Sequence, residues 1–331
     1  MERKIKDSKF LLPAICCLLL VIGFSLSFLW RPEIIKTDEI KSKHQGGYTY
    51  ISPLLECANS ESNLSETKEL EKKMKSFINK EKEKNNVEDI ALYFHDLTND
   101  NWIGINQSTE FSPASLLKVP LMIAYLKLAE TDPSILQNKI TVPIINSNSS
   151  IQNILPTNSV KIGQEYTIEQ LIEYSISYSD NQATDTLLLY MDSEFLNQIY
   201  SDLGLKELPT KAGIENFMSV REYASFFEIL YNASYLSKEM SEYALEILTK
   251  SIFKEGLVNG LAENTLIAHK FGERIFSNNR QLHDCGIVYT ENSPYLICIM
   301  TRQDVDSGED FSGLESIIQE LSKLAYSHIT M

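Results

Sequence analysis

A serine followed three residues later by a lysine supplies a nucleophile and a base, and this spacing occurs three times in the chain. The pairs are Ser65–Lys68, Ser115–Lys118 and Ser251–Lys254. A serine hydroxyl is a weak nucleophile that needs a base within hydrogen-bond reach. Because residues i and i+3 of a helix lie on the same face, each pair has a spacing suited to serine acyl transfer without histidine.

The surrounding residues favour Ser115–Lys118. Ser115 begins the apolar segment ASLLKVPLMIAYLKL, which would remove both side chains partly from water. Burial lowers the pKa of a lysine, and a second cation nearby lowers it further. The first turn of a helix also points backbone N–H groups at an oxyanion formed there. Ser65–Lys68 opens a highly charged helix, and Ser251–Lys254 is followed by no suitable partner except Lys270.

Two more short motifs follow this pair, Ser179-Asp180-Asn181 and then Lys270-Phe271-Gly272. In this order the three boxes resemble those of the penicillin-recognising serine enzymes, particularly the class A β-lactamases. The resemblance covers roughly residues 65–331. It implies a serine hydrolase that acts on β-lactams or on related acyl substrates, with no cofactor and no metal.

The resemblance implies a role for each matching residue. Ser115 would be the acylated nucleophile, and Lys118 its base or proton relay. Ser179 would pass a proton to the leaving nitrogen, and Asn181 would orient both the substrate amide and Lys118. Lys270 would attract the substrate carboxylate and lower the pKa of Lys118.

The third box would also contribute backbone. Gly272 belongs to the substrate-binding strand, and the backbone N–H groups of Ser115 and Glu273 would form the oxyanion hole. The residues alone leave two structural alternatives open. Ser179-Asp180-Asn181 is also a sequence that caps a helix, and Lys270 would also suit a solvated strand.

Two departures from the family pattern stand out. The third box normally has threonine or serine where this chain has Phe271, so the carboxylate-binding hydroxyl is missing and Lys270 would act alone. Class A enzymes also place a water-activating glutamate on a long loop before the helix that begins near Ser219. Here that loop is short, and only Glu207 and Glu215 are candidates for the role.

Hydrophobic periodicity predicts an α+β fold of two lobes. We expect an amphipathic helix at 65–84, a hairpin formed by 90–97 and 102–105, and a helix at 115–130. Helices dominate 165–262, three strands follow at 266–271, 286–290 and 295–301, and a helix ends the chain. A five-stranded antiparallel sheet with packed terminal helices, beside an all-helical lobe, satisfies this order, and a cleft between them is the natural site.

The N-terminus has a different character. Residues 10–30 are 21 residues without charge, which as a helix would span roughly 31 Å, about the thickness of a bilayer core. Arg3, Lys4, Lys6 and Lys9 precede them and favour a cytoplasmic N-terminus with an exported remainder. We expect an anchor at 1–30 rather than a cleaved signal peptide, an extracytoplasmic tether at 31–63 and a monomeric catalytic domain at 64–331.

Composition excludes several other classes. A formal charge of −15 argues against binding of nucleic acid. His283-Asp284-Cys285 is a poor zinc motif, because its potential ligands are nearly adjacent in sequence. Cys285 and Cys298 lie on neighbouring predicted strands, but a turn near 292–293 would not bring them directly opposite each other.

Three functions are therefore compared. The first is a membrane-tethered β-lactam hydrolase that is acylated on Ser115. The second is a D,D-peptidase or penicillin-binding protein that acts on peptidoglycan stem peptides. The third is a module that binds peptidoglycan or a protein without turnover; the complete serine and lysine set argues against it, because a pure binder needs no desolvated lysine base.

Overall fold

The computed structural model describes residues 48–53, 64–84, 87–144, 152–205, 215–276, 278–291, 293–304 and 310–331. The predicted membrane segment at 10–30 and most of the tether at 31–63 lie outside these residues, and so does Glu207. Within the described ranges, no helix is both long and apolar enough to span a membrane. Residues Ser42–Met331 form one compact unit.

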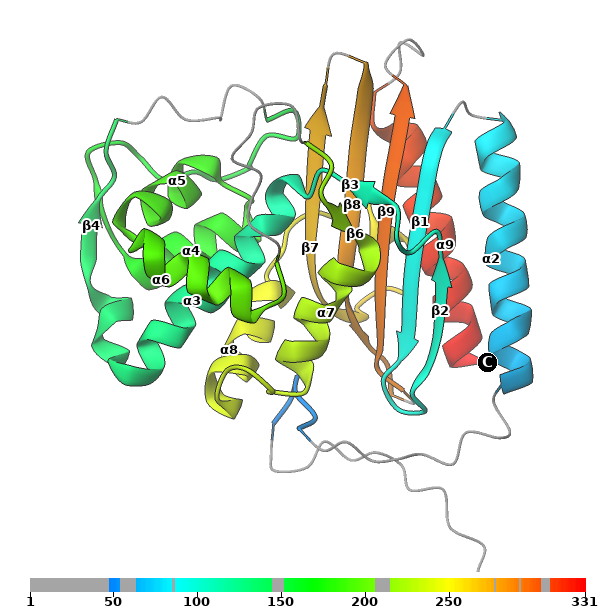
Figure 1. Ribbon diagram of the computed structural model, residues 1–331, viewed down its shortest axis with the longest axis horizontal. Helices are drawn as coiled ribbons and strands as arrows, with labels where there is room; N and C mark the ends of the chain where they lie inside the picture. Colours follow the sequence, from blue (N-terminus) through cyan, green and yellow to red (C-terminus); the bar gives the residue numbers. More distant parts are fainter. Residues whose placement is uncertain are drawn as a thin grey trace, which may run out of the picture. The chain divides into compact units, whose positions relative to one another are not determined.

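A five-stranded antiparallel sheet is the centre of this unit (Figure 1). Its strands follow the order β2-β1-β9-β8-β7, so the strands from the two ends of the chain pair at its middle. The sheet confirms the predicted fold class, although β7 and β8 extend well beyond the predicted ends. The bounds are β1 Val87–Asp96, β2 Asn101–Ile105, β7 Leu266–Ile275, β8 Asn279–Tyr289 and β9 Tyr295–Asp304.

Alternating side chains divide the strands between two apolar clusters. Along β1, Ile90, Leu92 and Phe94 belong to a cluster with the two terminal helices, α2 (Leu64–Lys84) and α9 (Ser312–Thr330). Ala91 and Tyr93 belong instead to the cluster that contains the inner faces of α7 (Val220–Tyr231) and of the helical lobe. This period of two is the expected pattern for a sheet covered on both faces.

The helical lobe lies beyond the β7 edge of the sheet (Figure 1). Two short strand pairs, β3 (Glu110–Phe111) with β6 (Met218–Ser219) and β4 (Lys139–Thr141) with β5 (Glu165–Thr167), complete its connections. Its elements are η1 Ala114–Leu117, α3 Lys118–Thr131, η2 Pro133–Gln137, α4 Ile168–Ser177, α5 Asn181–Tyr190, α6 Ser193–Asp202 and α8 Lys238–Thr249, and η4 Leu257–Gly260 leads back to the sheet.

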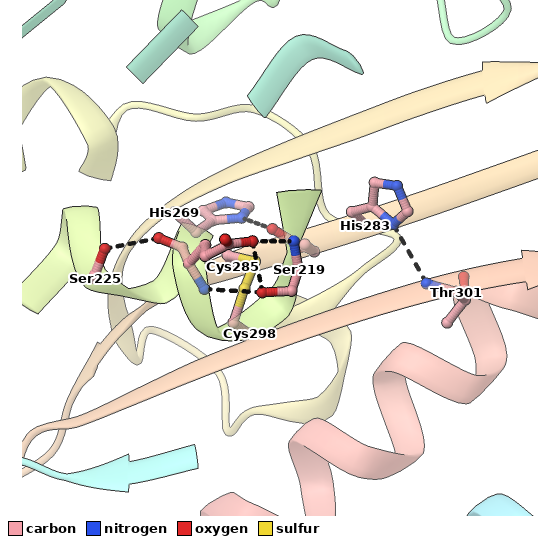
Figure 2. The surroundings of a disulfide bond; sticks show 9 residues. Ser219, Ser225, His269, His283, Cys285, Cys298 and Thr301 are labelled. Carbon is pink, nitrogen blue, oxygen red and sulfur yellow. Dashed lines mark hydrogen bonds and ion pairs between the residues drawn. A yellow bond between two sulfur atoms is a disulfide. The ribbon is translucent and has the colours of Figure 1, made fainter. Parts of the chain in front are cut away.

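A disulfide joins Cys285 and Cys298 across β8 and β9 (Figure 2). The two residues are direct partners in the antiparallel register, so the expected offset between them was wrong. The reason lies in the connection between the strands. Thr290 and Ser293 bond to each other through hydroxyl and backbone groups, and the connection closes about one residue earlier than the sequence suggested.

Candidate active site

The nucleophile candidate Ser115 lies in a single tight turn at the start of the lobe. This turn, η1, runs into α3, whose first residue is Lys118. Ala114 has a φ of 48°, a left-handed conformation that is uncommon for a residue with a Cβ. The sequence predicted one helix from 115; the structure divides it into a 3-10 turn and an α-helix. The change of helix type keeps Ser115 and Lys118 on the wall of one cavity.

Strand β7 passes directly beside this turn at Gly272. A Cβ added there would lie 2.9 Å from the carbonyl oxygen of Pro113 and 3.0 Å from Cγ of Leu116. Both distances are shorter than ordinary van der Waals contact, and the first involves backbone that cannot rotate away. The third box therefore needs glycine at this position, because the strand and the serine turn pack without a side chain between them.

Lys118 is 4% exposed and its ammonium group is fully engaged. Nζ donates hydrogen bonds to the carbonyl oxygen of Ser179 at 2.6 Å, to Oδ1 of Asn181 at 2.7 Å and to Oγ of Ser179 at 3.2 Å. Burial lowers the pKa of Lys118 to about 7, and the nearby carboxylates of Asp180, Asp185 and Glu273 oppose the shift. A lysine in this state is partly neutral at physiological pH and can accept a proton.

Lys270 lies behind the cavity wall, with no exposed surface. Its Nζ donates to Oγ of Ser179 at 2.9 Å and to the carbonyl oxygen of Phe271 at 2.9 Å. Burial, together with the charge of Lys118, holds the pKa of Lys270 well below its usual value. Both lysines therefore donate to the same hydroxyl, which leaves the hydrogen of Ser179 available for another acceptor.

The second box both caps a helix and faces the lysines. Oδ1 of Asp180 accepts from the backbone N–H of Gln182 and caps α5, so the structural alternative for this box is realised too. Ser179 has a φ of 56°, in the left-handed region. Strained backbone of this kind occurs often at functional sites. Here it accompanies the contacts of Ser179 and Asn181 with Lys118.

Glu273 closes one side of the site with its side chain. Its carboxylate accepts hydrogen bonds from the backbone N–H of Asn153 at 2.6 Å, the side-chain amide of Asn153 at 2.8 Å and the backbone N–H of Ile154 at 3.1 Å. Next to these residues, Nε2 of Gln152 donates to the carbonyl oxygen of Ser179 at 3.1 Å. The segment 152–154 therefore connects β7 to the second box, and sequence analysis did not identify it.

Phe271 does not reach the cavity. Its ring is 4% exposed and stacks on Phe253, with ring centroids 4.1 Å apart and planes at 19°. Nζ of Lys270 lies 4.2 Å from the centroid of the Phe271 ring. The aromatic side chain thus supports the buried lysine from the apolar side, while the predicted substrate contacts of Phe271 and of the Lys270 ammonium group remain predictions.

The cavity in front of these residues has a volume of about 440 Å³, which lies in the range for small-ligand sites. Ser115, Lys118, Asn181 and Glu273 line it, as predicted for residues of one site. Glu215 and Arg274 also line it. Glu215 is the described one of the two loop candidates. Arg274 follows the third box by two positions, and no motif in the sequence identified it.

Two side chains of β8 hold the chain just before the serine turn. Oε1 of Gln281 accepts from the backbone N–H of Ser112 at 2.9 Å, and Nε2 of His283 bonds the carbonyl oxygen of Ser112 at 3.0 Å. Nε2 of Gln281 also donates to Oδ1 of Asn216 at 2.9 Å. Both side chains are fully buried. They position the serine turn relative to the sheet, and Gln281 links it to the segment that carries Glu215.

The sequence His283-Asp284-Cys285 has a structural role. Asp284 bonds Nδ1 of His269 at 2.9 Å and the backbone N–H of Leu257 at 2.9 Å, while Cys285 is in the disulfide. Among the residues that the structure describes, no three histidine, cysteine or acidic side chains group into a metal site.

A nucleophilic serine, a desolvated lysine and a second hydroxyl shared by two lysines define a serine acyl-transfer site. Comparison with known proteins agrees. The profile of the beta-lactamase enzyme family, Beta-lactamase2, matches residues 69–329. The chain is 26% identical over 241 residues to the extended-spectrum beta-lactamase PER-1 of Pseudomonas aeruginosa, covering 67% of this chain and 76% of PER-1. It is 24% identical over 248 residues to the beta-lactamase VEB-1 of the same organism, covering 68% and 80%.

Solved structures share the fold. PBP-A aligns with a TM-score of 0.64 at 21% identity, over 83% of this chain and 98% of that chain. The TLA-1 extended-spectrum beta-lactamase aligns with a TM-score of 0.65 at 18% identity, over 80% and 99%. A variant of PBP-A has been solved as its acyl-enzyme complex with penicillin G. The protein belongs to the beta-lactamase enzyme family, and it is a β-lactamase-like serine hydrolase.

Proposed function

We propose that the protein opens β-lactams, or cleaves related acyl substrates, through a covalent ester on Ser115. The observation that carries this proposal is the placement of Lys118. Its amine is buried, has a pKa lowered to about 7 and lies on the same cavity wall as Ser115. A lysine in this state is the base that a serine hydroxyl requires.

In the acylation step, Oγ of Ser115 attacks the carbonyl carbon and its proton passes to the neutral amine of Lys118. The carbon–nitrogen bond then breaks, and the leaving nitrogen takes a proton through Oγ of Ser179. This hydroxyl accepts from both lysines, so it can donate its own hydrogen and be resupplied. The backbone N–H groups of Ser115 and Glu273 are proposed to bind the oxyanion.

Water then hydrolyses the ester and releases the acid. Of the two glutamates predicted for this step, Glu215 lines the cavity and is exposed in it. We propose that Glu215 accepts the proton of the attacking water. The ester oxygen returns to Ser115 as a hydroxyl, and the product leaves with the added water.

A D,D-peptidase of peptidoglycan is the second candidate. Two observations favour it over an efficient lactamase. The loop before α7 carries no glutamate in the family's arrangement, and Lys270 is sealed from the cavity where it would meet a carboxylate. The two functions share the acylation step and differ in how fast the ester is hydrolysed.

We further propose that residues 10–30 anchor the enzyme in the membrane with the catalytic domain outside the cytoplasm. The uncharged segment and the basic residues before it support this orientation. The disulfide between Cys285 and Cys298 supports it independently, because such bonds persist in oxidising compartments.

The test uses the full-length protein, with benzylpenicillin and a chromogenic cephalosporin, followed by intact mass over time. We expect an adduct that the Ser115→Ala variant does not form. A transient adduct with turnover indicates a lactamase, and a persistent one indicates a penicillin-binding enzyme. Absence of any adduct would refute acylation by these ligands. The same cells, separated into membrane and soluble fractions with and without residues 1–30, test the anchor; a wild-type protein found in the soluble fraction contradicts it.

A further inference from the structure

Arg274 is a cation on the cavity wall that no described residue pairs with. It lies on β7 directly after Glu273 and lines the same cavity as Ser115. Its Nε is buried and has no hydrogen-bond partner in the described part of the chain. Its guanidinium carbon lies 5.3 Å from the centroid of the Phe276 ring, a cation–π contact that supports the side chain without neutralising it. A partly desolvated cation without a counterion is costly unless a ligand supplies the anion.

The other cations of the site are already engaged. Lys270 has no exposed surface and donates to Ser179 and to the carbonyl of Phe271. Lys118 reaches the cavity wall but donates three hydrogen bonds within the protein. Among the described lining residues, Arg274 is therefore the cation whose donors remain open to an anion in the cavity.

The position of Arg274 along β7 indicates which part of the substrate it would meet. It is four residues beyond Lys270, or about 13 Å at 3.3 Å per residue of strand. Its register partner is Gln281, whose amide bonds Asn216 beside Glu215. Arg274 thus lies toward the Glu215 end of the site, away from the Ser179 end, where the leaving nitrogen is protonated. The part of a substrate on the opposite side of the scissile carbonyl is its acyl substituent.

We propose that Arg274 is a specificity-determining residue that binds a carboxylate on the acyl portion of the substrate. The inference rests on the proposed serine acyl transfer for the direction of the substrate. An arginine binds a carboxylate through two parallel N–H donors. The acyl carboxylate can belong to the side chain of a penicillin or to an acidic residue in a peptide acyl donor.

Glu215 and Glu273 make this selectivity depend on one residue. Both carboxylates line the same cavity, and Glu273 is committed to Asn153 and Ile154. Without Arg274, the Glu215 end of the cavity would repel an anionic acyl group. Replacement of Arg274 should therefore remove the preference for a carboxylated acyl group and leave binding of an uncharged one largely unchanged.

The experiment measures equilibrium binding to full-length Ser115→Ala protein, which cannot form the ester. The probes are benzylpenicillin and α-carboxybenzylpenicillin, which differ by one acyl-side carboxylate. We expect about tenfold tighter binding of the carboxylated probe, as for a hydrogen bond to a charged group. The preference should disappear when Arg274→Gln is added and persist in part with Arg274→Lys. Arg221→Gln, which removes the same charge away from the cavity, should leave it intact.

A second probe pair distinguishes the sources of the carboxylate. It consists of acyl-D-alanyl-D-alanine peptides whose acyl residue carries either a carboxylate or the corresponding amide. A preference in either pair that Arg274→Gln abolishes supports the inference, and the pair that shows it identifies the source. No preference in either pair, no binding, or a preference that survives Arg274→Gln overturns it. If the preference is present but wild-type protein forms no adduct, the proposed acylation fails and the role of Arg274 stands.

Discussion

The pairs Ser115–Lys118 and Ser251–Lys254 have the same spacing and opposite environments. Lys118 is 4% exposed and bonded to Ser179 and Asn181, and it lines the cavity with Ser115. Lys254 is exposed, and its pair follows the end of α8 in a segment without helix. Oγ of Ser251 is buried without a hydrogen-bond partner among the described residues. Neither residue of this second pair lines the cavity.

The difference shows that the motif supplies the groups and the surrounding elements supply their chemistry. Lys118 is desolvated because α3 buries it and because the second box, 61 residues later, satisfies its donors. An exposed lysine stays protonated at neutral pH and is no base. Three contacts from other segments, rather than the spacing itself, distinguish the catalytic pair from its copy.

The largest expected effect compares the two lysines directly. Lys118→Ala should slow acylation of Ser115 by about 10²- to 10⁴-fold, because a positioned general base contributes this much. Lys254→Ala is the matched control and should leave the rate within about twofold, since surface changes rarely alter a distant site. Rates come from intact mass against time, with thermal melting to show that both variants fold. Equal losses in both would contradict the comparison.

A smaller effect is expected at the point where β7 meets the serine turn. Gly272→Ala places a methyl group against the carbonyl of Pro113 and should displace the turn, with about a 10²-fold loss of acylation rate. Gly104→Ala is the control on another strand of the same sheet, where the added methyl would meet only the movable end of Gln107. The prediction fails if Gly272→Ala acylates at the wild-type rate.

The smallest effect is graded with pH. With a pKa of about 7, Lys118 is neutral above this value and protonated below it. The acylation rate should reach a plateau above pH 7 and fall about tenfold per unit below it. Because this pKa lies below that of a lysine in the unfolded chain, the folded protein binds fewer protons between about pH 7 and 10. The group should therefore make the free energy of unfolding rise with pH over that window.

His283 sets the lower limit of this measurement. Burial lowers its pKa to about 4, and in its neutral form it bonds the carbonyl of Ser112 and accepts from the backbone N–H of Thr301. An unfolded histidine takes up a proton near pH 6.5, so this group destabilises the fold as pH falls from about 6.5 to 4. Unfolding curves in the same buffers separate this loss from the titration of Lys118. A rate that does not change between pH 6 and 8 would refute the assigned base.

Much of the fold follows from local patterns. The period of two along 90–97 and 295–301 and the amphipathic terminal helices predicted the sheet and the two helices that cover it. The ends of β7 and β8 were underestimated because Arg274 and Gln281 are polar, and polarity argues against a strand unless tertiary contacts bury it. Gln281 is fully buried and satisfied by Ser112 and Asn216, residues that no local pattern connects to it.

The sequence by itself determined the boxes, their order and the class of chemistry, because these depend on residue types and spacing. It also determined that the third box has no hydroxyl, since Phe271 is visible in it. Only the tertiary structure decided which lysine is desolvated, that Lys270 lies behind the cavity wall, that Cys285 meets Cys298 and that Arg274 faces the cavity. The physical reason is that burial, register and the pairing of charges depend on segments far apart in the chain, which the fold alone brings into contact.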